Sequence, residues 1–168
     1  MRPSLLRHAD FVPWRPAAGD ACELCRQRGG VPVADAARWR VVRVADAAFP
    51  AFYRLIWNVH VTEFSDLDDG DRAECIDAVV RIERALRAAL APTKINLASL
   101  GNVVAHLHWH VIARFAWDSH FPQPVWGAAQ RVVEPPAAAR LALTLGALDG
   151  AVRAALGAAV LAQDAPPG

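Results

Sequence analysis

The sequence predicts an α+β domain in which an antiparallel sheet is covered by one helix, with an extra helix at the C-terminal end. Strand-like runs occur in pairs before and after a single amphipathic segment, which favours a hairpin, helix, hairpin order. Between Ala105 and Arg114, histidines alternate with apolar residues. A strand would place His106, His108 and His110 on one face, whereas a helix would turn His108 away from the other two. We therefore expect Ala105 to Arg114 to be a strand that presents a row of imidazoles.

Length and composition limit the class of protein. The chain has 168 residues, of which 54% are hydrophobic and 21% charged, enough for one well-packed domain. A net charge of +1 argues against a nucleic-acid-binding surface, so we expect a small molecule or another protein as partner. Charged residues interrupt every apolar run, and three cysteines do not make a disulfide framework. These features predict a cytoplasmic protein without membrane association.

Residues 1–20 contain four turn-forming residues and no hydrophobic period, so we expect an irregular N-terminal arm. Cys22 and Cys25 follow as a Cys-x-x-Cys pair, and Gly29-Gly30 then predicts a turn. In a reducing compartment such a pair is usually a metal knuckle or a redox dithiol. The alternative is that both residues are small side chains buried in the core.

The first hairpin and the helix are predicted from local composition. Trp39–Val44 and Phe52–Trp57 are rich in β-formers and predict an antiparallel pair. The acidic segment Asp68 to Asp71 supplies an N-cap, and Pro92 ends the helix. Between them, a stripe at helical spacing is formed by Ile76, Val79, Val80, Glu83, Leu86 and Leu90.

The second half of the chain supplies the other hairpin and a last helix. Lys94–Leu100 and Ala105–Arg114 are expected as strands joined by a turn at Gly101-Asn102. Phe115–Gly127 is aromatic and turn-rich, and we expect a loop or lid there. Pro135-Pro136 then opens a helix predicted from Ala137 to about Gln163. The expected division is therefore an arm at 1–20, a domain at 21–135, and a C-terminal helix and tail at 136–168.

The run His106-Leu-His108-Trp-His110-Val-Ile resembles the signature of the histidine triad (HIT) superfamily of nucleotide hydrolases and transferases. Gly101-Asn102 lies where that family commonly has Gly-Gln, and Arg114 where its strand commonly ends in Pro-Arg. Leu55 to Leu67 is similar to the family's second strand and the loop after it. The resemblance extends roughly from Cys22 to Arg114.

The resemblance implies a HIT-like fold whose sheet pairs with that of a second subunit in a homodimer. It also implies a nucleotide-binding phosphohydrolase or nucleotidyl transferase. His108 would attack the α-phosphate of a dinucleoside polyphosphate or nucleoside phosphoramidate, giving a covalent nucleotidyl-His108 intermediate. No cofactor is required for that chemistry, and an adenine nucleotide is expected by analogy.

Roles for the neighbouring side chains follow from the resemblance and from their chemistry. A backbone carbonyl near His106 would hold the tautomer of His108, and His110 would donate to a phosphate oxygen or the bridging oxygen. Asn102 and Asn96 are candidates for neutral phosphate-binding donors. The alternatives are a structural role for His106 and simple turn chemistry for Asn102.

Two positions depart from the family pattern. Phe52 stands where many members have a histidine in the second strand, and Val103 stands where many have Ser or Thr. One hydroxyl on the phosphate side is therefore missing. A second class of function stays open for this reason, namely a non-enzymatic, zinc-stabilised module that binds a nucleotide or a protein.

A structural zinc site is implied by branches of the superfamily that bind zinc with a Cys-x-x-Cys pair and two histidines. Mapped onto this sequence, the ligands are Cys22, Cys25, His60 and His106. Four protein ligands are typical of a closed, structural zinc site rather than a catalytic one. The alternative is two buried thiols and a histidine at the end of a strand.

Overall fold

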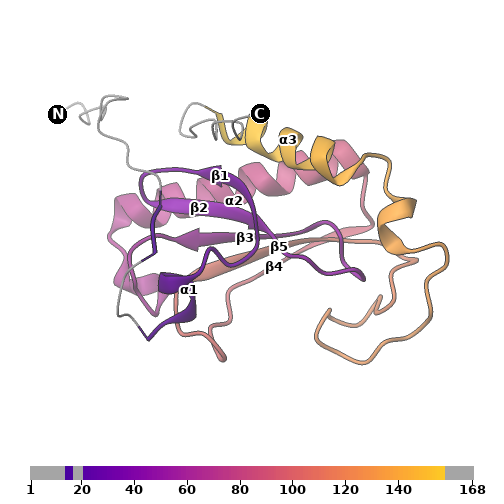
Figure 1. Ribbon diagram of the computed structural model, residues 1–168, viewed down its shortest axis with the longest axis horizontal. Helices are drawn as coiled ribbons and strands as arrows, with labels where there is room; N and C mark the ends of the chain where they lie inside the picture. Colours follow the sequence, from indigo (N-terminus) through magenta and orange to yellow (C-terminus); the bar gives the residue numbers. More distant parts are fainter. Residues whose placement is uncertain (1–13, 17–20, 158–168) are drawn as a thin grey trace.

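The computed structural model describes residues 14–16 and 21–157. A short helix, α1 (Glu23–Arg26), comes first and a five-stranded sheet follows. Its strands are β1 (Val31–Asp35), β2 (Trp39–Arg43), β3 (Phe52–Trp57), β4 (Lys94–Ala98) and β5 (His108–Arg114). The other elements are η2 (Phe64–Asp66), the long helix α2 (Asp69–Leu90), η3 (Ala137–Arg140) and α3 (Leu145–Leu156). This arrangement confirms the predicted α+β class (Figure 1).

All neighbouring strands of the sheet are antiparallel, in the order β1-β2-β3-β5-β4. The predicted β2-β3 pair is confirmed, and β5 lies between β3 and β4. Strand β1 was not predicted, because Pro32 breaks its short β-pattern. The structure places Pro32 on an edge strand, next to an irregularity in the ladder. An edge is where a residue without an N–H is tolerated in a sheet.

Helix α2 covers one face of the sheet, with α1 on the opposite side (Figure 1). Its N-cap is Asp68, as predicted, whose side chain accepts a hydrogen bond from the Asp71 N–H at 2.8 Å. Ala91 ends the helix in the left-handed conformation, directly before Pro92. The main core lies between the buried residues of α2 and one face of β3 and β5.

The prediction of one continuous helix from Ala137 to about Gln163 is wrong within the described residues. The chain forms η3, becomes extended at Leu141, and begins α3 only after Thr144. Thr144 is an N-cap whose hydroxyl accepts a hydrogen bond from the Ala147 N–H, which starts a new helix where we expected a continuation. The predicted part beyond Gly157 lies outside the described residues.

Helix α3 packs beside α2 and against β1 (Figure 1), and one buried carboxylate ties it to the sheet. Asp149 accepts hydrogen bonds from the Tyr53 hydroxyl at 2.7 Å and from Arg43 Nε at 2.9 Å. Burial, followed by the bond to Asp149, raises the pKa of Tyr53 well above its usual value. Tyr53 is therefore the donor in this contact.

The second hairpin differs from the prediction at its turn. β4 ends at Ala98 and β5 begins at His108, so residues 99–107 form a longer connection than a turn at Gly101-Asn102. His106 lies in this connection, where its N–H bonds to the Val104 carbonyl oxygen at 2.8 Å. The regular ladder with β3 therefore begins only after His106.

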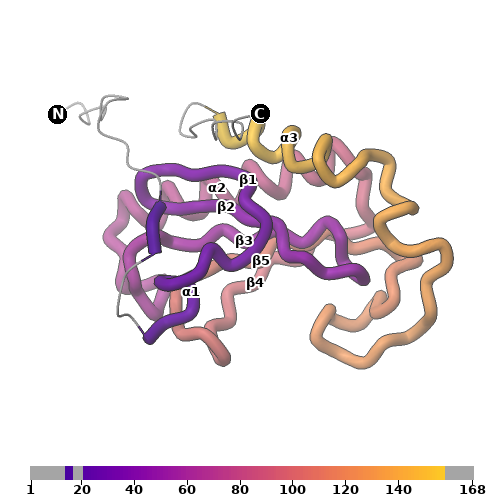
Figure 2. The backbone as a smooth tube through the Cα atoms, in the orientation of Figure 1, coloured from indigo at the N-terminus to yellow at the C-terminus, as the bar shows by residue number. Residues whose placement is uncertain are grey.

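The predicted loop at Phe115–Gly127 is confirmed and makes a long excursion, orange in Figure 2. A buried ion pair anchors its start, because Arg114 Nε donates to Asp118 at 2.7 Å.

Of the expected arm at 1–20, only residues 14–16 are described. The guanidinium carbon of Arg40 lies 4.1 Å from the centroid of the Trp14 ring. Among the described residues, no helix is long and apolar enough to span a membrane.

Candidate active site and metal centre

Strand β5 places His108 and His110 on the face of the sheet that points away from α2. Their rings are 4.7 Å apart. In the register, His108 lies opposite Ile56 and His110 lies opposite Arg54, and residues directly opposite each other share a face. Trp109, between them, points to the other face and packs on the ring of Phe64. The alternation predicted for these positions is confirmed.

The orientation of His108 is fixed by a backbone oxygen. Its Nδ1 lies 2.6 Å from the carbonyl oxygen of His106. A carbonyl only accepts hydrogen bonds, so Nδ1 carries the proton and Nε2 keeps its lone pair. Burial, partly offset by this bond, lowers the pKa of His108, and Arg54 lowers it further. His108 is therefore a buried imidazole in the tautomer that carries its lone pair on Nε2.

His110 is surrounded by aromatic rings. Its ring centroid is 5.3 Å from that of Phe52 and 5.2 Å from that of Trp126, which belongs to the 115–127 loop. Burial, with contributions from His108 and Arg54, lowers the pKa of His110 to about 3. Its Nδ1 is buried and has no hydrogen-bond partner among the described residues. A buried polar atom without a partner costs free energy unless a ligand or water supplies one.

His106 lies before β5, which corrects the prediction that one strand begins at Ala105 and carries all three imidazoles. Its Nε2 donates to the carbonyl oxygen of Trp57 at 2.7 Å. That bond leaves the lone pair on Nδ1, which is 3.5 Å from the sulfurs of both Cys22 and Cys25. His106 therefore presents a metal-ligating nitrogen to two thiols, while its carbonyl group orients His108.

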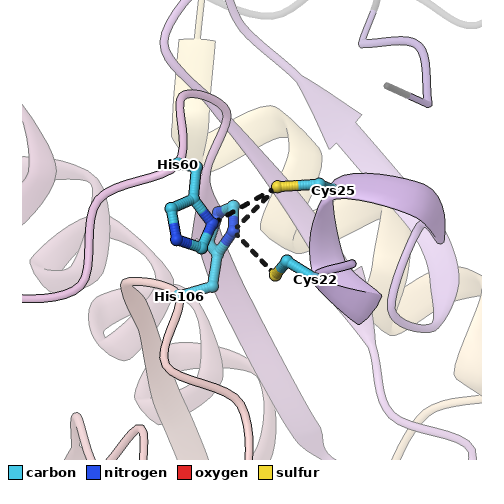
Figure 3. A group of neighbouring side chains, drawn as sticks. All are labelled: Cys22, Cys25, His60 and His106. Carbon is cyan, nitrogen blue, oxygen red and sulfur yellow. Dashed lines mark hydrogen bonds between the residues drawn. The ribbon is translucent and has the colours of Figure 1, made fainter. Parts of the chain in front are cut away.

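His60 completes a group of four side chains that converge from three separate parts of the chain (Figure 3). Its Nδ1 lies 3.4 Å from the sulfur of Cys25, and the four ligand atoms are all within 4.8 Å of one another. Tetrahedral zinc, with bonds of about 2.3 Å to sulfur and about 2.0 Å to nitrogen, separates such ligands by about 3.6 Å. The observed distances fit that geometry, and the cluster can hold a zinc ion.

The Cys-x-x-Cys knuckle is also held by the protein itself. The guanidinium of Arg40, on β2, is fully buried and donates to the carbonyl oxygens of Leu24, Gln27 and Arg28. These carbonyls belong to α1 and the residues just after it. The nearby turn needs glycine at position 30, because a Cβ there would lie 2.6 Å from the carbonyl oxygen of Arg43.

The two asparagines predicted to bind phosphate differ in their positions. Asn96 lies on β4 opposite Ile112, on the face of His110. Its side-chain oxygen accepts a hydrogen bond from Arg114 at 2.8 Å, which leaves the amide nitrogen as the donor. Asn102 is exposed in the connection between β4 and β5, as is Val103, which is 97% exposed.

Several residues of this face were not identified from the sequence. Arg54 and Trp126 both lie near His110, and the Trp57 carbonyl sets the tautomer of His106. One signal was available for Arg54, the only charged residue in the strand Phe52–Trp57. Nothing in the sequence alone indicated that it lies opposite His110.

A family model described as HIT domain matches residues 32–117, more than half of the chain. Among curated proteins, none matches the sequence significantly.

Solved structures of histidine triad proteins are similar to this chain. A histidine triad protein from Bradyrhizobium japonicum is 27% identical, with a TM-score of 0.65, covering 86% of this chain and 99% of its own. One from Sinorhizobium meliloti 1021 is 31% identical, with a TM-score of 0.56 and coverage of 64% and 81%. A third, from Marinobacter aquaeolei VT8, shares the fold at 22% identity, with a TM-score of 0.61 and coverage of 77% and 90%.

Proposed function

The chain belongs to the HIT domain family, and from this and the geometry of His108 we propose that it is a nucleotide-binding hydrolase or nucleotidyl transferase. It cleaves at the α-phosphate of dinucleoside polyphosphates or nucleoside phosphoramidates. The main support is the hydrogen bond from His108 Nδ1 to the His106 carbonyl oxygen, because it leaves the lone pair of Nε2 free to act as a nucleophile.

The first step forms a covalent intermediate. The lone pair of His108 Nε2 attacks the α-phosphorus, and a nitrogen–phosphorus bond forms as the bond from phosphorus to the leaving group breaks. The leaving group takes the electron pair and then a proton from the solvent. Positive charge that develops on the ring is stabilised by the His106 carbonyl oxygen, which already accepts the Nδ1 proton.

The second step releases the nucleotide. The oxygen of water, or of another acceptor, attacks the same phosphorus, and the nitrogen–phosphorus bond breaks. The electron pair returns to Nε2, and the proton of the attacking oxygen passes to the solvent. His110 and the amide nitrogen of Asn96 are the donors that we assign to the phosphate oxygens, together with the exposed Asn102.

A bound zinc ion would support this site rather than take part in the reaction. With Cys22, Cys25, His60 and His106 as ligands, it would fill its coordination shell with protein atoms. Its chemistry would be structural, because no position remains for substrate. The chain's own contribution is to join α1 to the residue whose carbonyl orients His108.

Further expectations accompany the proposal. An adenine nucleotide is the expected substrate, and residues 21–135 are the expected catalytic domain. A homodimer is expected through the sheet, and Leu97 and Leu100, at and just after the edge strand β4, are exposed. Thiol ligands must stay reduced to bind a metal, which favours the cytoplasm as the compartment.

A second candidate function is a zinc-stabilised module that binds a nucleotide or protein without turnover. The residue that favours it is Val103, which is exposed on the loop before β5 and cannot offer the hydroxyl that many family members have there. Such a module would keep the metal cluster and the fold but would have little or no hydrolytic activity.

Turnover and binding of the same ligand separate the two functions. We expect the protein to hydrolyse diadenosine tetraphosphate or adenosine 5′-phosphoramidate, with AMP as a product. His108→Asn should abolish hydrolysis while AMP binding, measured by calorimetry, stays within a few-fold. Equal hydrolysis by both proteins would contradict the assignment of His108. Binding of AMP without hydrolysis by the unaltered protein would favour the module.

A further inference from the structure

Arg54 is a charged residue on the same face of the sheet as the two histidines of β5. It lies directly opposite His110, and opposite residues in a sheet have Cβ atoms about 5 Å apart. Its guanidinium carbon is also 5.8 Å from the ring centroid of Phe52, which borders His110. Arg54 therefore shares the immediate surroundings of the nucleophile.

Arg54, which is half-buried, makes fewer hydrogen bonds than the buried arginines Arg40 and Arg114. Arg114 donates to Asp118, Asn96 and the Gln123 carbonyl oxygen. By contrast, Arg54 donates only to the Gly29 carbonyl oxygen, at 3.4 Å, among the described residues. Its Nε is buried and has no partner there.

Arg54 and His110, which lie opposite each other in the sheet, each carry a buried nitrogen that has no hydrogen-bond partner among the described residues. No ion pair between Arg54 and a carboxylate is found among the described residues. Burial lowers the pKa of Arg54, and the Glu23 carboxylate partly offsets this without forming an ion pair. A half-buried guanidinium that makes no ion pair can accept an anionic ligand, and its planar fork of donors matches phosphate geometry. The positive charge of Arg54 also acts on His110, whose pKa is lowered mainly by burial, then by His108, and further by Arg54.

We propose that Arg54 binds the phosphate adjacent to the one that His108 attacks, so that the substrates are nucleotide anhydrides rather than phosphoramidates. An anhydride places a second charged phosphate beside the scissile bond, whereas the amine of a phosphoramidate offers no charge to a guanidinium. This inference rests on the proposed function for the site itself. It also supplies a phosphate-binding group to a chain whose exposed Val103 offers no hydroxyl.

Kinetics with two substrates test this assignment. For Arg54→Gln, we expect kcat/KM for diadenosine tetraphosphate to fall roughly ten- to a hundredfold, and that for adenosine 5′-phosphoramidate to change less than about threefold. For Arg54→Lys, kcat/KM for diadenosine tetraphosphate should lie between those of the unaltered protein and Arg54→Gln, because lysine keeps the charge but lacks the fork of donors. Arg26→Gln, which removes an exposed charge from α1, should leave both values unchanged.

A binding measurement decides the same point without turnover. In the His108→Asn background, calorimetry should show that Arg54→Gln weakens ATP binding at least tenfold and AMP binding less than threefold. Equal loss for both nucleotides, or for both substrates, would overturn the proposal and make Arg54 structural. If the unaltered protein turns over neither substrate, the proposed function fails, yet the ratio of ATP to AMP affinity still decides the role of Arg54. If Arg54→Gln does not fold, Arg54→Lys decides by the same ratio.

Discussion

The carbonyl oxygen of His106 lies 2.6 Å from Nδ1 of His108, while the ring of His106 faces Cys22 and Cys25 at 3.5 Å. One residue therefore belongs to both sites: its side chain to the metal cluster and its backbone to the nucleophile. A displacement of His106 changes the hydrogen bond that selects the tautomer of His108. We therefore expect the metal cluster and the proposed catalytic site to be coupled through this residue.

Removal of a metal ligand should therefore lower the rate of a reaction in which the metal takes no part. We expect Cys25→Ser to reduce the zinc content and to lower kcat roughly ten- to a hundredfold. Elemental analysis and steady-state kinetics on the same samples measure both quantities. Cys75→Ala is the matched control, because Cys75 is a residue of α2 that is buried in the main core and should affect stability but not zinc content. Full kcat in a zinc-free variant would contradict the coupling.

Stability should fall in acid because of His110. Its pKa of about 3 lies below the usual value near 6.5, so between these pH values the unfolded chain binds more protons than the native one. The stabilisation is therefore fully present above about pH 6.5 and is lost progressively as the pH falls toward 3. In that window, His110→Gln should reduce the slope of unfolding free energy against pH by up to about 1.4 kcal/mol per unit. Urea unfolding at several pH values measures the slope, and an unchanged slope would contradict the burial of a neutral His110.

The contact that holds α3 to the sheet should be costly to remove. Asp149→Asn removes the carboxylate that pairs with Arg43, whose side chain is largely shielded from solvent. We expect a loss of about 2–3 kcal/mol in unfolding free energy. Asp77→Asn is the matched control, because Asp77 pairs with Arg81 on an exposed surface of α2, where such pairs contribute less than about 1 kcal/mol. Chemical unfolding of both variants gives the comparison. Equal losses would show that Asp149 acts as an ordinary surface charge.

The elements predicted from local patterns are those with strong composition signals. The strand Phe52–Trp57 matches β3 at both ends, and the N-cap at Asp68 starts α2 as expected. The last helix was predicted too long because alanine-rich sequence favours helix everywhere, while Thr144 selects a new N-terminus by one side-chain bond. The strand β1 was missed because Pro32 is acceptable only at an edge, and edges are set by the whole sheet.

The candidate site could be predicted where the chemistry lies in a short motif. His108, His110 and the four metal ligands were named from residue type and resemblance, and the structure brings the ligands together. The direction of the His106 ring depends on a carbonyl at Trp57, far away in sequence. Likewise, Arg54 lies opposite His110 only through the register of β3 with β5, which no local pattern specifies.

The central claim is that His108 becomes covalently attached to a nucleotide. It is tested most directly by mass spectrometry of the intact protein after brief mixing with diadenosine tetraphosphate, quenched above neutral pH to preserve a phosphoramidate bond. We predict an added mass equal to one adenylyl group on the unaltered protein, absent from His108→Asn, with peptide mapping that locates it on His108. AMP formation without any adduct, or an adduct on the variant as well, would contradict the claim.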